Sequence, residues 1–354
     1  MVLKHYISAI ITGRRRASWL ERVGLSALSY LFRAGVEARH FAYARGWMKQ
    51  AKLPVCVISV GNLVVGGTGK TPVVEKLVRA LQEMYRVAIL TRGSSSQIEA
   101  SGKSVRVASR GKLFCAVQEC GDEPFCLGSQ TLADVWVGKN RIVSGHKAIE
   151  LGAECLILDD GMQYLELKKD IHIAVVDGKD PFSEGRFLPR GMLRDLPVRL
   201  KGVDLVVANH VENEIALRAL QEKLKEVTDA PVVAMRPELL DIEAFKRQRV
   251  AVYCGIGRPE RFVEALSAAG VECADILNVL DHQLATEAEW SQFVKRCRKK
   301  GIHRILCTMK DWVKLPEEMR KTFPLSPVGM ELKILSGEEH WELLLKTVVD
   351  RIKR

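Results

Sequence analysis

A glycine-rich loop runs from Gly61 to Pro72, directly after a predicted strand and directly before a predicted helix. Backbone N–H groups of such a loop can turn inward on phosphate oxygens, and the positive end of the following helix attracts the same anion. In this phosphate-binding loop, or P-loop, we expect Lys70 to contact the β and γ phosphates and Thr71 to bind Mg²⁺. Val64 stands where the strict motif has its first glycine. The predicted nucleotide-binding residues of the loop are Gly66, Gly67, Thr68, Gly69, Lys70 and Thr71.

Two adjacent carboxylates, Asp159 and Asp160, follow the apolar run Cys155–Leu158. A hard cation that bridges nucleotide phosphates needs oxygen ligands at the carboxyl end of such a strand. We therefore expect Asp159 and Asp160 to lie at a magnesium site beside the P-loop. Together the two motifs predict nucleotide hydrolysis or phosphoryl transfer, and they leave the acceptor open.

Short β-branched runs alternate with helical stretches from Pro54 onward, which favours an α/β fold built on a doubly wound, mostly parallel sheet. We expect the P-loop core in residues 51–208, a second, smaller α/β domain in 209–354, and basic amphipathic helices in 1–50. The strands predicted in the first unit are 54–60, 86–90, 134–137, 155–158, 171–176 and 204–208, with helices at 72–83 and 141–151. In the second unit we predict strands at 231–235, 250–254 and 302–308 and helices at 215–226, 260–269 and 287–300.

The positive charge is concentrated at the N-terminus. Residues 1–50 carry nine Lys or Arg against two Glu, so they supply +7 of the net +11. Apolar side chains recur there at helical spacing, at Leu20, Val23, Leu28, Leu31 and Phe32. Such a helix can lie in the surface of an anionic bilayer, or its apolar face can pack on the protein itself. The sequence contains no apolar run of the length that a transmembrane helix needs.

Composition excludes several classes of protein. With 47% hydrophobic and 27% charged residues, the chain is neither disordered nor a small disulfide scaffold. Nine cysteines occur without any C-x-x-C pair, and the cluster Cys115, Cys120 and Cys126 matches no common metal-binding spacing. We interpret these cysteines as buried small hydrophobic residues of a protein from a reducing, cytosolic compartment.

A series of short motifs continues along the chain in a fixed order. They are Ser59–Asn62 with Gly66–Pro72, Gly121–Pro124, Asp159–Gln163, Leu188–Arg194, Gly255–Phe262, Asp281–His282 and Thr308–Leu315. In this combination the sequence resembles the tetraacyldisaccharide 4'-kinase family, the lipid A 4'-kinases of Gram-negative bacteria. That family's loop also lacks the first glycine, so Val64 fits it. The sequence departs from the family pattern at Ser94, Tyr164, Arg190 and Gln283.

The resemblance implies a reaction: transfer of the γ-phosphoryl group of ATP to the 4'-hydroxyl of a tetraacylated glucosamine disaccharide 1-phosphate. A sugar hydroxyl needs a positioned base to take its proton, and the resemblance assigns that role to Asp122, oriented by His282 from the second domain. Lys70 and Asp160 complete the predicted catalytic set, with Mg²⁺ on Thr71, Glu123 and Asp159. Arg141 is assigned to the nucleotide. The candidate acceptor contacts are Arg92, Arg186 and Arg194.

The resemblance also places the protein at the cytoplasmic face of the inner membrane, as a peripheral or monotopic enzyme. The expected cofactors are ATP and Mg²⁺, and the expected partners are the lipid A disaccharide precursor and the anionic membrane surface. We expect no nucleic-acid partner, and we infer no obligate protein partner.

Two other functions and two structural roles remain as alternatives. A P-loop GTPase or ATPase switch, or a metallochaperone-like protein, would share the loop, although Thr308–Asp311 lacks the spacing of a guanine-reading motif. A nucleic-acid-binding ATPase would share the basic charge, but here that charge lies on an amphipathic N-terminal segment. Asp122 also suits a helix N-cap, and His282 suits a turn.

Overall fold

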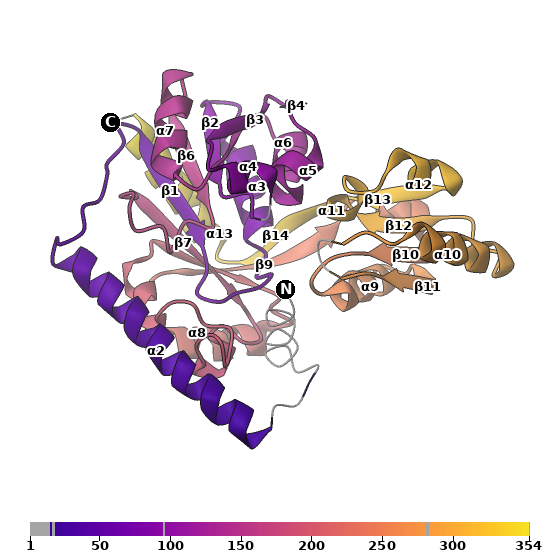
Figure 1. Cartoon of the computed structure of the whole chain (residues 1–354), viewed down its shortest axis with the longest axis horizontal. Helices are drawn as coiled ribbons and strands as arrows, with labels where there is room; N and C mark the ends of the chain where they lie inside the picture. The colour runs from indigo at the N-terminus through magenta and orange to yellow at the C-terminus, as the bar shows by residue number, and fades with distance from the viewer. Residues whose placement is uncertain (1–14, 16–17, 95, 281–282, 354) are drawn as a thin grey trace.

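The structure is a computed structural model that describes residues 15, 18–94, 96–280 and 283–353 (Figure 1). Within these residues ten strands form one sheet, in which seven neighbouring strands, β9 to β5, are parallel and the edge strands β14, β3 and β4 are antiparallel. This arrangement confirms the predicted α/β fold. In spatial order the strands are β14 (Met330–Ser336), β9 (Val232–Leu239), β8 (Leu205–Asn209), β7 (Ile171–Asp177), β1 (Cys56–Gly61), β6 (Cys155–Asp159), β2 (Val87–Thr91), β5 (Asp134–Val137), β3 (Val105–Ser109) and β4 (Lys112–Leu113).

Helices cover both faces of this sheet. On one face the core joins α3 (Lys70–Leu81), α6 (Asp122–Gln130) and α13 (Glu338–Ile352) to the side chains of Ile58 and Ile173. On the other face α7 (Arg141–Glu150) and α8 (Glu214–Lys225) pack on the alternate residues of the same strands. Every residue of β1 is buried, which explains why its sequence is continuously apolar instead of alternating. Shorter elements are α4 (Gln97–Ser101), α5 (Val117–Cys120) and the 3-10 turns Ser183–Gly185, Pro197–Gly202 and Ile242–Phe245.

A second, smaller unit carries its own parallel sheet, seen on the right of Figure 1. Its core is built around Tyr253, Trp290 and Phe293, with the rings of Tyr253 and Trp290 5.6 Å apart, edge to face. The strands, in spatial order, are β11 (Glu272–Asn278), β10 (Arg249–Cys254), β12 (Ile305–Thr308) and β13 (Leu325–Val328). The helices are α9 (Pro259–Ala268), α10 (Glu287–Lys299), α11 (Met309–Trp312) and α12 (Glu317–Thr322).

Two antiparallel strands connect the units (Figure 1). Strand β9 leads out of the large sheet and β14 leads back into it, with Leu239 opposite Met330. The chain therefore leaves the large sheet later than the expected boundary at residue 209. Helix α8 and β9 continue the large sheet beyond that residue, and the chain changes sheets only after Leu239. After β14 the chain stays with the large sheet, because α13 packs on its core.

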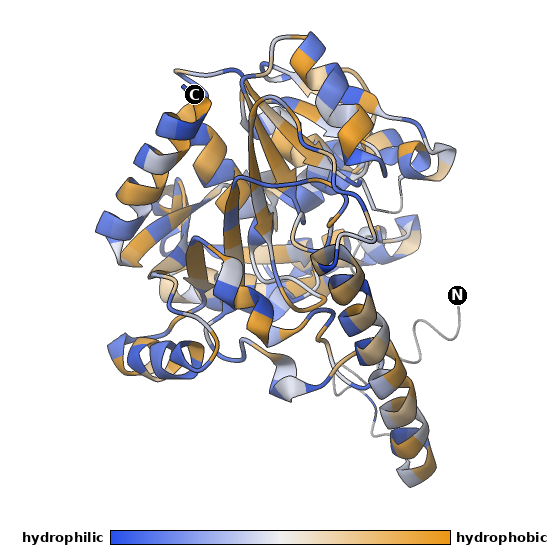
Figure 2. Cartoon of the chain, turned by 90° about the vertical axis from the view of Figure 1, so that its left-hand side faces the viewer, coloured by the Kyte–Doolittle hydropathy of each residue, from blue (hydrophilic) through white to orange (hydrophobic). Residues whose placement is uncertain are grey.

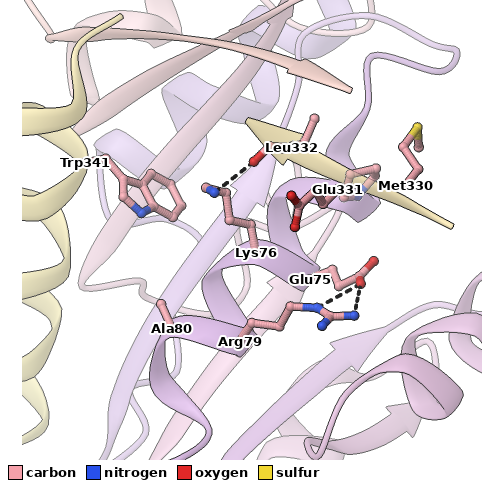
Figure 3. A pocket seen from close by; sticks show the side chains of 9 residues that line it. Glu75, Lys76, Arg79, Ala80, Met330, Glu331, Leu332 and Trp341 are labelled. Carbon is pink, nitrogen blue, oxygen red and sulfur yellow. Dashed lines mark hydrogen bonds and ion pairs between the residues drawn. The ribbon is translucent and has the colours of Figure 1, made fainter. Parts of the chain in front are cut away.

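The return strand β14 is also attached to α3, the helix that follows the P-loop. Figure 3 shows Lys76 of α3 directed at β14, where its Nζ donates to the carbonyl oxygen of Leu332 at 2.8 Å. Trp341 of α13 lies beside this bond, and together the three elements line a cavity of about 260 Å³. Glu75 and Arg79 form an ion pair at 2.7 Å on its wall. The cationic groups of Lys76 and Arg79 in this cavity are thus satisfied by the protein itself.

Helix α2 (Trp19–Ala44) lies along one side of the core and extends past it (Figures 1 and 2). Ser18 and Glu21 form a capping box at its start. The Ser29 hydroxyl donates to the carbonyl oxygen of Phe187 at 2.8 Å, and His40 pairs with Asp195 at 2.7 Å. The apolar face is only partly used in this packing: Trp19 is 75% exposed, and Leu20, Leu28 and Leu31 are also exposed. None of the described helices is long and apolar enough to span a membrane.

Candidate active site

The glycine-rich loop lies between β1 and α3, as predicted, and two asparagines hold it. Asn209, at the end of β8, donates to the carbonyl oxygens of Thr68 at 2.9 Å and Gly69 at 3.3 Å. Asn62 donates to the Thr68 hydroxyl at 2.9 Å. Gly69 has a φ of +83°, and a Cβ there would lie 2.4 Å from the Asn209 Nδ2 atom. A side chain at residue 69 would therefore strain the backbone and displace the asparagine that supports the loop.

Lys70 and the two predicted carboxylates meet at the carboxyl end of the central strands. The Lys70 Nζ lies 3.5 Å from Asp160, and Arg194 binds the same carboxylate with two N–H groups. Burial alone would raise the pKa of Asp160, but Arg194 and Lys70 together hold it below its usual value. Asp160 is therefore an ionised partner of the P-loop lysine.

Asp159 differs from its neighbour because it is buried and pairs with no cation among the described residues. Its carboxylate accepts a hydrogen bond from the Thr91 hydroxyl at 3.3 Å. Burial, followed by the nearby charges of Glu123 and Asp160, raises the pKa of Asp159 to about 7. A divalent cation at this carboxylate would relieve both the burial cost and the repulsion.

The second unit reaches the predicted base. Asp122 is buried at the start of α6, and the Nζ atoms of Lys310 and Lys314 lie 3.5 Å and 3.9 Å from its Oδ2 atom. Lys310 also lies 3.6 Å from Glu123. His282, the predicted orienting residue, lies outside the described residues. The two lysines belong to the motif Thr308–Leu315, so this motif meets the core at Asp122.

Asp311, in the same motif, has a structural role in the described residues. It is fully buried, accepts a hydrogen bond from the Thr308 hydroxyl at 2.8 Å, and pairs with Lys314 at 3.1 Å. The Asp311 backbone N–H also donates to the Thr308 hydroxyl oxygen at 3.1 Å, which caps α11, and the ion pair holds Lys314 toward Asp122.

No group of three or more His, Cys, Asp or Glu side chains in the described part of the chain is arranged to hold a metal by itself. Cys120 and Cys126 are buried and Cys115 is partly buried, with burial raising the pKa of all three thiols. The acidic groups that face Asp159 are instead Glu123 and Asp160. Such a partial set suits Mg²⁺, which commonly takes one or two carboxylates and completes its shell with phosphate oxygens and water.

A model of the LpxK family, described as tetraacyldisaccharide-1-P 4'-kinase, matches residues 21–349. The chain belongs to this family. The tetraacyldisaccharide 4'-kinase of Chlamydia pneumoniae is 35% identical over 303 residues, covering 81% of this chain and 80% of the relative. That of Syntrophus aciditrophicus (strain SB) is 30% identical over 351 residues, covering 92% and 93%. A crystal structure of LpxK from Aquifex aeolicus in complex with ATP gives a TM-score of 0.74 at 29% identity, covering 94% of this chain and 99% of that one. The expected family membership is confirmed, and the protein is a kinase.

The family's candidate arginines have different surroundings in this chain. Arg194 lies in the site, on Asp160 and Asn62. Arg92 is exposed and pairs with Glu99 at 2.5 Å, and Arg186 is exposed and pairs with Glu184 at 3.2 Å. Arg194 is therefore the one of these three that contacts the predicted catalytic carboxylates.

Arg141 is buried at the start of α7 and stacks on Tyr164, one of the departures from the family pattern. Its guanidinium lies 5.0 Å from the centre of the Tyr164 ring, and its backbone N–H donates to the Tyr164 hydroxyl at 3.1 Å. Burial lowers the pKa of Arg141. Tyr164, which stands where the family usually has another residue, thus positions Arg141. Arg190, a second departure, donates to the Ser26 hydroxyl of α2 at 2.7 Å.

Sequence reasoning did not assign four residues that shape this site. Asn62 and Asn209 hold the loop, and Lys310 and Lys314 contact Asp122. A signal existed for Asn209, which ends an apolar run just as Asp159 does, and carboxyl ends of parallel strands meet at one edge. The two lysines lie four residues apart, but nothing in that spacing identifies a partner in another unit.

Proposed function

We propose that this chain transfers the γ-phosphoryl group of ATP to the 4'-hydroxyl of a tetraacylated glucosamine disaccharide 1-phosphate, a reaction of lipid A biosynthesis. The observation that carries the proposal is the meeting of Lys70, Asp159 and Asp160 at one sheet edge, within a chain that belongs to the 4'-kinase family. Catalysis of phosphoryl transfer is mainly positioning and charge stabilisation, and these residues are suited to both.

In this proposal the loop residues Gly66 to Thr71 hold the phosphates of ATP. Lys70 exchanges its contact with Asp160 for the β and γ phosphates, while Arg194 keeps Asp160 in place. Thr71, Glu123 and Asp159 would hold Mg²⁺, which would neutralise phosphate charge during transfer.

Asp122 is the proposed base for the acceptor hydroxyl. Asp122 and Glu123 are the first two residues of α6. The start of this helix would therefore supply both a ligand of the metal and the base for the acceptor hydroxyl. Lys310 and Lys314 make the orientation of Asp122 depend on the second unit. Closure of the second unit on the core would then complete the site around the acceptor.

The acceptor is a lipid, and α2 supplies a surface that suits a bilayer. Its exposed apolar residues would enter the interface, and each basic residue near an anionic leaflet would add about 1 kcal/mol of attraction. We propose a peripheral or monotopic enzyme at the cytoplasmic face of the inner membrane.

The test is transfer of labelled γ-phosphate from Mg·ATP to tetraacyldisaccharide 1-phosphate in mixed micelles. Lys70→Ala is expected to lower kcat/KM roughly 10²- to 10³-fold, and Asp122→Asn roughly 10²- to 10⁴-fold. Asp122→Asn should also remove the acidic limb of the pH profile of kcat/KM, which a merely structural residue would leave in place. The exposed lysine variant Lys346→Ala serves as the matched control. ATP turnover by the wild type without transfer to the lipid would reject the acceptor.

The membrane assignment has its own test. Leu20→Ser, Leu28→Ser and Leu31→Ser are combined in one variant, since these side chains are exposed and do not support the core. This variant should float poorly with anionic vesicles and keep its thermal midpoint. Flotation equal to that of the wild type would contradict the role of α2.

A further inference from the structure

A basic cavity of about 280 Å³ lies on the core unit, at the amino ends of β7 and β8. In parallel strands this is the opposite end from the P-loop, Asp159 and Asn209. Lys168, Lys169, His172 and Arg199 line it, and none of its described lining residues is acidic. The cavity therefore gathers positive charge away from the site described above.

Lys169 is the central residue of this cavity. It is only 8% exposed, and among the described residues its ammonium group makes no hydrogen bond or ion pair. Glu166 and Asp195 act on Lys169 from a distance without pairing with it: Glu166 pairs through Oε1 with Arg39 at 2.9 Å, and Asp195 pairs with His40 at 2.7 Å. Buried lysines are normally paired, because an isolated buried charge is costly. A buried ammonium that lines a cavity and has no direct partner among the described residues favours an anion in that cavity.

The other cationic side chains add to the same field. Lys168 and Arg199 are exposed at the rim, and no ion pair of either side chain occurs among the described residues. Burial and the charge of Lys169 lower the pKa of His172 to about 4, so its ring stays neutral and has one N–H to donate. Three cations and a neutral donor around a small cavity suit a compact anion with several oxygens, and a phosphate group best.

One residue that lines the cavity follows closely after exposed apolar side chains in the sequence. Gln50 lines the cavity and donates to the carbonyl oxygen of Leu165 at 2.6 Å. Two and three residues before it, Met48 is exposed and Trp47 is 73% exposed. Tryptophan is enriched at membrane interfaces, at the depth of the lipid headgroups. Contact of Trp47 and Met48 with a bilayer would therefore bring Gln50, and with it the cavity, near the membrane surface.

We propose that the cavity around Lys169 binds a phosphate group at the bilayer surface, separately from the nucleotide phosphates at the P-loop. Two sources carry this chemistry there: the headgroup of an anionic phospholipid, and the 1-phosphate of the acceptor. The membrane placement rests on the proposed function, whereas the phosphate site rests on Lys169 and its neighbours. The first measurement is therefore binding, which needs no kinase activity.

The experiment compares the wild-type chain with Lys169→Met and Arg199→Gln, and Lys346→Met is the control for net charge. Lys169→Met keeps the side-chain volume and removes a buried charge, and Arg199→Gln alters an exposed rim residue, so neither should prevent folding. The first arm measures binding to phosphatidylglycerol vesicles and to neutral phosphatidylcholine vesicles. The second arm measures the KM of the acceptor and of ATP in neutral detergent micelles.

A headgroup site predicts roughly tenfold weaker binding of Lys169→Met to phosphatidylglycerol vesicles, with the acceptor KM unchanged. An acceptor site predicts a roughly tenfold higher acceptor KM with the ATP KM unchanged, and vesicle binding like that of the control. Arg199→Gln should move the same quantity by less. The proposal is overturned if Lys169→Met and Arg199→Gln match Lys346→Met in both arms. If the wild-type protein transferred no phosphate, only the proposed function would be rejected, because vesicle binding can be measured without kinase activity.

Discussion

Positive side chains gather at both ends of the central parallel strands, but the described residues that line the site include acids at one end only. At the carboxyl end, Lys70 and Arg194 pair with Asp160, and Asp159 and Glu123 lie close by. At the amino end, the cavity around Lys169 has cations and no acidic lining residue among those described. The difference lies in which ligand each end can accept.

A mixed set of acids and bases suits a metal–phosphate complex, because the carboxylates bind the metal while the lysine and arginine face the phosphates. A purely cationic set suits a phosphate alone, because a divalent cation would be repelled. The unusual pKa values follow the same division. At the carboxyl end an acid, Asp159, is pushed toward its neutral form, and at the amino end a base, Lys169, is pushed toward its neutral form.

Removal of Mg²⁺ should separate the two ends most strongly. With EDTA in excess, phosphoryl transfer is expected to fall to background, because the phosphate charge loses its metal. Binding to phosphatidylglycerol vesicles should not change, since the Lys169 cavity needs no metal. The measurement is labelled transfer and vesicle flotation on the same sample, with added Mg²⁺ restoring transfer. Flotation that depends on Mg²⁺ would mean that the two ends do not differ as argued.

Lys169→Met should stabilise the protein when no phosphate ligand is present. Burial is the main cause that lowers the pKa of Lys169 from 10.5 to about 8, which corresponds to a cost on the order of 3 kcal/mol. The cost is fully present below pH 8 and disappears as the pH rises from about 8 to 10.5, where the unfolded chain also loses the proton. Chemical denaturation at pH 7 should give the variant the larger free energy of unfolding. The gap to the wild type should narrow toward pH 10.5.

A destabilised Lys169→Met protein would mean that the ammonium has a stabilising partner. The exposed Lys346→Met variant should change the free energy of unfolding little at either pH. A gap that persists at pH 10.5 would attribute the effect to packing of the methionine, not to the lost charge.

The carboxyl end of the sheet could be predicted from sequence far better than the amino end. Lys70 and Asp159 lie in motifs whose placement between strand and helix follows from local pattern. The pairing of β9 with β14, the two strands that connect the units, could not be predicted, because the whole second unit separates them in the sequence. Lys169 also gives no local signal: in sequence it is one of two adjacent lysines, and only the packing around β7 buries it and leaves Lys168 exposed.

Lys76 offers a third lysine whose removal should act in the opposite direction to Lys169. Its ammonium donates to the carbonyl oxygen of Leu332 at 2.8 Å in the cavity of Figure 3, so its charge already has a partner. Lys76→Met should lower the free energy of unfolding by about 1 kcal/mol, the usual net value of one hydrogen bond. Vesicle binding should stay at the wild-type level. Denaturation of Lys76→Met and Lys169→Met side by side at pH 7 therefore tests the comparison in its simplest form. If both variants changed the free energy of unfolding in the same direction, a hydrogen-bond partner of the ammonium group would not decide whether removal of the lysine stabilises or destabilises the protein.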